Sequence, residues 1–196
     1  MIFMTTKFLK SIAIASIAFV LFAFELPDHW HAAGSEPKKY DMGIEKGAGP
    51  NGKNAATIKS KDRHPNGFGT LMQTSVADKY LGKRVRMSGY MKSEDVVDWA
   101  GLWLRVDGVN GTRAMAFDNM AKRPVKGTTD WRKYEIVLNI PLTASSFSYG
   151  ALLCETGQIW FTDINFEIVD NTVPTTGECE VCSLPEQQPV NLSFEN

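Results

Sequence analysis

Apolar and polar residues alternate along several stretches of this chain of 196 residues, and the alternation is clearest in residues 84–91. Val85, Met87 and Met91 share one side of that stretch, and arginine, serine and tyrosine side chains occupy the other. A period of two with one apolar side is typical of an antiparallel strand that buries one face. Residues 84–91 are therefore predicted to form a half-buried strand.

Two later stretches repeat this alternation. In residues 131–140 the predicted inward face consists of Tyr134, Ile136, Leu138 and Ile140. In residues 160–168 it consists of Trp160, Ile164, Phe166 and Ile168. Shorter strands are expected at residues 55–59, 68–74, 101–106, 113–117 and 147–153, with one helical turn within 76–81. Glycine, proline, asparagine and aspartate separate these segments, so the pattern predicts an all-β sandwich or barrel.

The two ends of the chain differ in composition from the middle. Two lysines precede an apolar run that ends near residue 24, so residues 1–23 are predicted to be a signal peptide or an N-terminal anchor. The alternative is a buried first strand or helix of a cytosolic protein. The sandwich is expected over residues 24–170, followed by a linker-like, proline-containing tail at 171–196. Residues 190–195 echo the end of the N-terminal run and form a candidate extra strand.

Composition excludes some functions and leaves others. A hydrophobic content of 43% and an aromatic content of 11% are typical of a packed globular protein. The formal net charge of −1 gives no reason to expect binding to nucleic acid, and membrane contact is expected only through an uncleaved N-terminal segment. The sequence contains no nucleophile elbow, zinc-protease helix or phosphate-binding glycine loop, so we expect no enzyme activity.

The three cysteines fall into two groups. Cys154 lies in an apolar run and is predicted to be a small core residue. Cys179 and Cys182 form a CxxC pair, which can be redox-active, half of a metal site or a disulfide. The pair lies in the tail and no second pair exists, so an incidental or simply oxidised pair is expected.

The segment 99–107 is the strongest candidate for binding. If its aliphatic residues face the core, Trp103 and Arg105 face outward, where an indole ring can stack on a sugar and a guanidinium can donate to its hydroxyls. The alternative is a Trp103 buried under a loop at residues 95–99, with Arg105 laid across it. Further candidates on the same face or nearby are Tyr90, Arg86, Gln73, Asp118 and Asn119.

Several segments together resemble the galactose-binding-like jelly-roll family over residues 24–169. The N-terminal part of that fold has counterparts here in Phe24-Glu25, Trp30, Gly34-Ser35 and residues 40–43. Residues 127–138 and 159–167 resemble later strands of the family. The resemblance implies an antiparallel two-sheet β-sandwich of the jelly-roll type. It also implies a kinship with carbohydrate-binding modules and with accessory domains beside bacterial peptidases, esterases and regulators.

The resemblance further implies a candidate structural calcium site. In similar sandwiches the first and last strands adjoin, and a carboxylate from each often helps to hold the ion. In this chain the corresponding residues are Glu25 and Asp163. Calcium prefers several oxygen ligands at once, and two carboxylates are only part of such a set. Two ordinary surface acids are the alternative, and no other cofactor is expected to be required.

Two functions remain at this stage. The first is a non-catalytic, exported module, in the cell envelope or secreted, that binds carbohydrate or a similar polyhydroxylated ligand. The second is a structural or protein-interaction accessory domain, associated with a partner hydrolase or regulator, that has no small ligand of its own. The two differ in whether the face that carries Trp103 and Arg105 is open or covered by loops.

Overall fold

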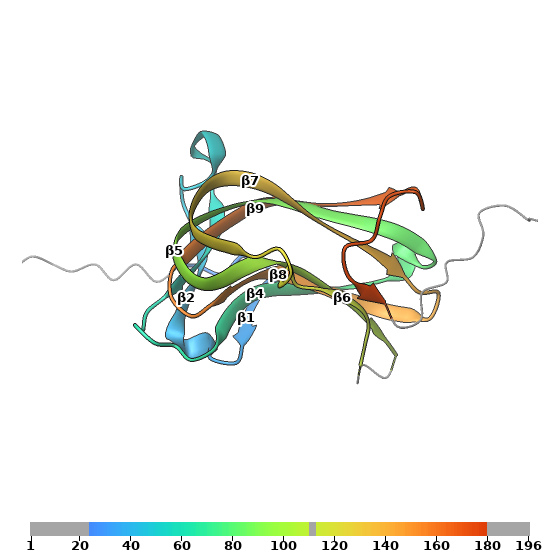
Figure 1. The fold of residues 1–196 in the computed structure, drawn as a ribbon, viewed down its shortest axis with the longest axis horizontal. Coiled ribbons are helices and arrows are strands. Elements are labelled where there is room, and N and C mark those ends of the chain that lie inside the picture. The colour runs from blue at the N-terminus through green and yellow to red at the C-terminus, as the bar shows by residue number, and fades with distance from the viewer. Residues whose placement is uncertain (1–23, 110–112, 180–196) are drawn as a thin grey trace, which may run out of the picture.

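The computed structural model describes residues 24–109 and 113–179, which form ten β-strands and three short 3-10 helices (Figure 1). No α-helix occurs in these two ranges. The strands are β1 (His31–Gly34), β2 (Tyr40–Glu45), β3 (Ala55–Ser60), β4 (Phe68–Val76), β5 (Lys83–Gly108), β6 (Ala114–Asp118), β7 (Val125–Ile140), β8 (Ala144–Cys154), β9 (Gln158–Val169) and β10 (Glu178–Cys179). The 3-10 helices are η1 (Pro37–Lys39), η2 (Pro50–Gly52) and η3 (Asp78–Tyr80).

Strand β5 is 26 residues long and belongs to both layers of the sandwich. Its first part pairs with β7 on one edge and β9 on the other, and its second part pairs with β6 and β8. The pairing with β7 shifts register between Met91 and Ala100, and Asp95 has a φ of 49°. Figure 1 shows that β5 bends there from one layer into the other.

The strands form two antiparallel sheets that share β5. The first sheet has the order β2-β3-β9-β5-β7, and the second has the order β1-β4-β8-β5-β6-β10. Their inner faces pack against each other around fully buried side chains such as Met87, Met91, Leu104, Ile136 and Leu138. The predicted all-β, antiparallel two-sheet sandwich is therefore confirmed, and so are the inward faces predicted for residues 84–91 and 131–140.

The prediction for the last long strand is wrong at two positions. Ile159 and Phe161 enter the core, whereas Trp160 packs on the outer side against Lys92 and Glu45. A β-bulge at Asp163, with a φ of 53°, adds one residue to β9 opposite β5 and reverses the alternation. Ile164 and Phe166 face inward as predicted. Ile168 is 50% exposed because it lies near the end of the strand.

Residues 171–179 pack on the sandwich, contrary to the linker-like tail expected there. The backbone N–H of Thr176 donates to the carbonyl of Val137 at 2.9 Å, and the N–H of Val137 donates to Oγ1 of Thr176 at 2.9 Å. Arg84 Nη1 donates to the carbonyl of Val173 at 2.6 Å. This segment therefore packs along the edge of the sandwich, next to β6 and β7.

Other predictions about the chain ends concern residues that the structure does not describe. The signal peptide or anchor at 1–23, the candidate strand at 190–195 and Cys182 all lie outside the described ranges. Cys179 is disulfide-bonded, and Cys154 is a free, half-buried thiol. The described ranges include no helix that is long and apolar enough to cross a membrane.

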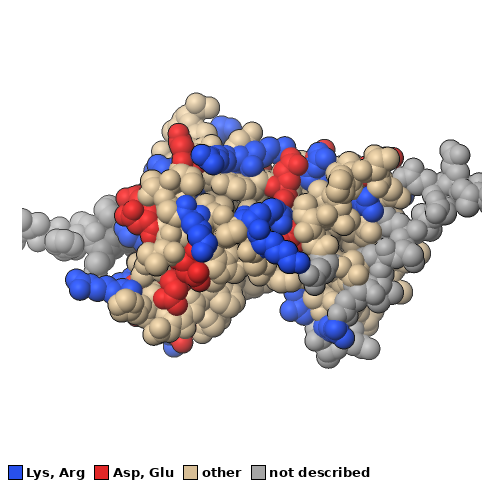
Figure 2. Space-filling view, viewed as in Figure 1, with Lys and Arg blue, Asp and Glu red and all other residues tan. Residues whose placement is uncertain are grey.

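Charged side chains of both signs are interspersed on the face of the molecule shown in Figure 2. Arg86 is one example of such pairing in the molecule, because its guanidinium contacts Glu167 at 2.9 Å and Glu135 at 3.5 Å. Lys133 contacts the same Glu135 at 2.8 Å. Such partly exposed pairs at the surface contribute little stability, and their mixed signs create no broad field of one sign.

Candidate functional site

The second part of β5 sends alternate side chains to opposite faces of the second sheet. Leu102, Leu104 and Val106 are fully buried in the core between the sheets. Trp103 and Arg105 project from the outer face, as the alternation predicts. Residues 95–99 do not form a covering loop, because they continue β5. The outer face of the second sheet is consequently the place to look for a site.

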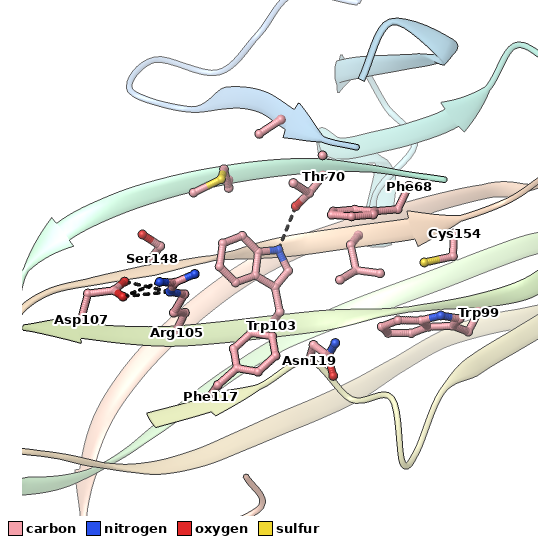
Figure 3. A pocket seen from close by; sticks show the side chains of 14 residues that line it. Phe68, Thr70, Trp99, Trp103, Arg105, Asp107, Phe117, Asn119, Ser148 and Cys154 are labelled. Carbon is pink, nitrogen blue, oxygen red and sulfur yellow. Dashed lines mark hydrogen bonds and ion pairs between the residues drawn. The ribbon is translucent and has the colours of Figure 1, made fainter. Parts of the chain in front are cut away.

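A pocket of about 480 Å³ lies on this outer face, where β1, β4, β8, β5 and β6 lie side by side (Figure 3). Most of its walls are aromatic or aliphatic, and one ion pair lies at its end. The lining residues are Ala33, Gly34, Phe68, Thr70, Met72, Trp99, Trp103, Arg105, Asp107, Phe117, Asn119, Ser148, Leu152 and Cys154. A volume of roughly 300–1,000 Å³ is usual for small-molecule sites, so this pocket has the size of a ligand site.

Trp103 forms the floor of the pocket. Its indole Nε1 donates to Oγ1 of Thr70 at 2.8 Å, and that hydroxyl donates to the carbonyl of Ala151 at 2.7 Å. The bond from Nε1 links Trp103 of β5 to Thr70 of β4 across β8, which lies between the two strands. Only 8% of Trp103 is exposed, so the predicted open stacking platform is wrong. Its N–H group is already bonded within the protein.

The accessible aromatic surfaces come from Phe68, Trp99 and Phe117, which stand around Trp103 in Figure 3. Phe117 is 38% exposed, and Phe68 and Trp99 are half-buried. None of these three residues was among the binding residues predicted from the sequence. The sequence could have indicated Trp99, because this residue is four positions before Trp103 in the same strand and therefore lies on the same face. Phe68 and Phe117 reach the pocket only through strand pairing.

Arg105 and Asp107 form the polar end of the pocket. They are two residues apart on one face of β5, and Nε and Nη2 of the guanidinium each lie 2.8 Å from Oδ1 of Asp107. The side chain of Arg105 is 39% exposed and that of Asp107 is 14% exposed. Nη1 has no partner in the described part of the chain. The pair therefore offers a fixed donor beside a fixed acceptor.

Asn119 is the third predicted residue that the pocket contains. Its Oδ1 accepts from the backbone N–H of Ala121 at 3.2 Å, and in Figure 3 its nitrogen is turned toward Trp103. The neighbouring Asp118 was predicted as a ligand group, but its carboxylate is occupied. It accepts from Arg123 at 2.7 and 3.0 Å, and from the N–H of Met120 at 2.8 Å. Asp118 is thus a structural residue of the β6–β7 connection.

Three other predicted residues do not join the pocket. Tyr90 and Arg86 lie in the first part of β5, which pairs with β7 and β9, so they project from the outer face of the first sheet. The prediction that they lie beside Trp103 is wrong, because β5 passes from one sheet into the other between Tyr90 and Trp103. Gln73 faces the other side of β4 and accepts from the hydroxyl of Tyr149, a core residue.

The candidate calcium ligands are not adjacent. Glu25 forms an isolated bridge with Ile44 of β2, and β3 separates β2 from β9, which carries Asp163. Both side chains are exposed. No group of three or more His, Cys, Asp or Glu residues that could hold a metal occurs in the described ranges. The expected adjoining of first and last strands is therefore wrong for these two carboxylates.

Cys154 supplies the only thiol in the pocket lining. Burial, and then the negative charges of Asp98 and Glu155, raise the pKa of this thiol to about 12. A protonated thiol is a poor nucleophile, because the thiolate is the reactive form. Cys154 is consequently an inert part of the wall at neutral pH.

Comparison with solved structures defines the class of fold. The xylan-binding CBM22-1 domain of Paenibacillus barcinonensis Xyn10C has a TM-score of 0.52 and 12% identity, over 75% of this chain and 90% of that one. The enzymatically active domain of tailspike protein 4 from bacteriophage CBA120 has a TM-score of 0.56 and 11% identity, over 72% and 20%. A Stig cyclase of Fischerella sp. TAU, bound to an indole compound, has a TM-score of 0.51 and 12% identity, over 74% and 87%. The chain thus has the β-sandwich fold found in carbohydrate-binding modules, as the resemblance implied.

One curated relative is much closer in sequence. The chain is 41% identical over 167 residues to "Uncharacterized HTH-type transcriptional regulator YbfP" of Bacillus subtilis (strain 168). The match covers 85% of this chain and 56% of that protein, so the chain spans about half the length of the curated relative that it matches. No family model matches the chain.

Proposed function

We propose that this chain is a non-catalytic module that binds a carbohydrate, or a similar polyhydroxylated ligand, in the pocket on the outer face of the second sheet. One observation carries the proposal. Aromatic side chains from three strands surround a cavity of about 480 Å³ that ends in the ion pair of Arg105 and Asp107.

The chemistry of this lining suits a sugar. A sugar ring has an apolar C–H face, which packs on aromatic rings such as Trp99 and Phe117. It also carries hydroxyl groups that donate and accept. Arg105 can donate through Nη1, Asp107 can accept, and the amide nitrogen of Asn119 is turned into the same space. An apolar pocket with a few fixed polar groups is the usual form of a small-ligand site.

The titratable groups of the pocket support binding rather than catalysis. The lining contains Arg105, Asp107 and Cys154 as its ionisable side chains. The carboxylate of Asp107 is held by Arg105, and the thiol of Cys154 is protonated at neutral pH because its pKa is raised to about 12. General acid–base catalysis needs a group whose pKa lies near the working pH. The thiol of Cys154 does not meet that need.

Export to the envelope or the medium is part of this proposal. It is supported by the lysines and apolar run of residues 1–23, which precede the described ranges. Extracellular polysaccharides would be within reach of such a module. Signal removal can be checked by N-terminal sequencing of the protein recovered from the culture medium or envelope of a bacterial host.

The curated relative supports a second candidate function. A protein named as a transcriptional regulator contains a segment 41% identical to most of this chain. The domain can therefore serve as a structural or protein-interaction accessory unit attached to a regulator, with no small ligand of its own. Absence of binding by the unmodified chain to every glycan screened would favour this second function.

The test replaces an accessible aromatic residue of the pocket. Trp99→Ala should weaken binding of a positive glycan at least about tenfold, because the ring surface on which the sugar packs is lost. Glycan-array screening finds the positive glycan, and calorimetry measures the affinity. The matched control is Trp131→Ala, since Trp131 is also half-buried but lies on β7 of the first sheet. Equal affinities for the two variants would contradict the proposal.

A further inference from the structure

A second cavity adjoins the pocket. It has a volume of about 180 Å³ and is lined by Phe117, Asn119, Ala121, Lys122 and Thr176, together with Asp118, Arg123 and Gly177. Phe117 and Asn119 line both cavities, so the two spaces are neighbours with these side chains between them. A volume of 180 Å³ is below the roughly 300 Å³ at which independent small-molecule sites begin. The smaller cavity is therefore better understood as an extension of the larger one.

The two cavities differ in chemistry. The larger one is mostly aromatic and aliphatic, whereas polar and charged side chains dominate the smaller one. Asp118 and Arg123 neutralise each other there through two hydrogen bonds of 2.7 and 3.0 Å. Lys122 and Asn119 add donor groups to the lining. A unit rich in oxygen acceptors, such as a neutral sugar or a uronate, fits this second space.

The floor of the smaller cavity is rigid. The carboxylate of Asp118 accepts from Arg123, from the N–H of Met120 and from the hydroxyl of Thr176. Nη2 of Arg123 also donates to the carbonyl of Glu135 at 2.9 Å. These bonds tie the β6–β7 connection to the C-terminal segment 171–179. The cavity thus has a preorganised wall, which reduces the entropy lost when a ligand binds.

We infer that the smaller cavity is a second subsite and that the ligand is an oligosaccharide of at least two linked units. One ring lies against Trp99 and Phe117, and the next unit passes Asn119 to reach Lys122. This inference rests on the proposed function, because it extends the same pocket. It predicts that affinity rises with chain length, which a single enclosed pocket would not require.

The experiment uses the full chain and a glycan array that carries one-, two- and four-unit members of xylan, galactan, mannan and galacturonan series. We expect the four-unit member of the recognised series to bind at least about tenfold more tightly than its one-unit member. A gain of this size corresponds to one additional charge-assisted hydrogen bond. The neutral and galacturonan series distinguish a hydroxyl-rich unit from an acidic one. Equal affinity for all lengths would overturn the second subsite and leave the proposed function standing. Absence of binding to every series would overturn the proposed function itself.

Two variants then locate the subsite. Lys122→Ala removes a donor and Ala121→Leu narrows the cavity, and both positions are exposed. Thermal unfolding of each variant checks that the fold is retained. We expect each to reduce the affinity ratio of the four-unit to the one-unit glycan, while one-unit binding stays unchanged. The controls are Ala121→Ser and Lys126→Ala, the latter an exposed lysine of β7 outside both cavities. A ratio that stays at the wild-type value in both test variants would overturn the inference.

Discussion

At the scale of single residues, Trp103 shows how a buried polar atom determines a role. An indole ring on the outer face of a sheet is free to serve as a stacking surface only if its N–H group does not hold it elsewhere. Here Thr70 accepts that N–H at 2.8 Å across β8, and only 8% of the residue is exposed. Trp103 thereby supports the pocket from below, and Trp99 and Phe117 present the accessible ring surfaces.

The substitution Thr70→Val tests this support. The variant keeps the shape of the side chain but leaves the buried indole N–H without an acceptor, which costs about 1–3 kcal/mol of unfolding free energy. Urea unfolding measures the change. The control is Thr74→Val on the same strand, whose hydroxyl bonds Ser148 at an exposed position, and a change within about 0.5 kcal/mol is expected. A similar stability for the two variants would show that the bond is not structural.

At the scale of elements, β5 and β9 depart from simple alternation at their irregular positions. β5 keeps its pairing through residues 93–100 by shifting register, and it thereby joins the two sheets. β9 reverses its faces at Asp163, so Ile159 and Phe161 enter the core before the bulge and Ile164 after it. Strict alternation in the sequence cannot predict where the inward and outward faces of a strand exchange at a bulge.

The bulge gives a prediction for Asp163. Its φ of 53° lies in the left-handed region, which glycine adopts freely and β-branched residues resist. Asp163→Val should lower the free energy of unfolding by about 1–2 kcal/mol, whereas Asp163→Gly should not. Thermal and urea unfolding provide the measurement. Asn165→Val, at an exposed and regular position of β9, should be neutral, and an equal loss there would argue against backbone strain as the cause.

At the scale of the whole molecule, the end of the sandwich near the bend of β5 holds a buried tyrosine, Tyr40, and a half-buried cysteine, Cys154, whose pKa values are both raised. The hydroxyl of Tyr40 donates to the carbonyls of Gly67 at 2.8 Å and Glu155 at 3.1 Å, which joins β2 of the first sheet to loops of the second. Burial, followed by the nearby Cys154 and Glu155, raises the pKa of Tyr40 well above its ordinary value. Burial likewise raises the pKa of Cys154, from its ordinary 9.0 to about 12.

These shifts predict a loss of stability in alkali. Above pH 9 the unfolded chain releases the proton of Cys154, whereas the folded protein retains it until about pH 12. The unfolded state then binds fewer protons, so the free energy of unfolding falls as the pH rises through this window. Urea unfolding between about pH 8 and pH 11 should show a smaller fall for Cys154→Ala than for the wild type. Identical slopes would mean that the thiol ionises equally in both states.

The sequence alone determined the class of structure and most of the strands. Alternation is a local property, so it located the strands that became β3, β4, β6, β7 and β8, and it assigned Val85, Met87 and Leu104 to the core. The same logic placed Trp103 and Arg105 on a common outer face.

Only the tertiary structure decided which residues meet. Phe68 and Phe117 reach Trp103 because β4, β8, β5 and β6 pair side by side, and strands so distant in sequence leave no local trace of that order. Tyr90 and Arg86 do not line the pocket, because β5 passes into the other sheet between these residues and Trp103. Bulges and register shifts are set by the partners of a strand, so the composition of a binding face follows from pairing rather than from periodicity.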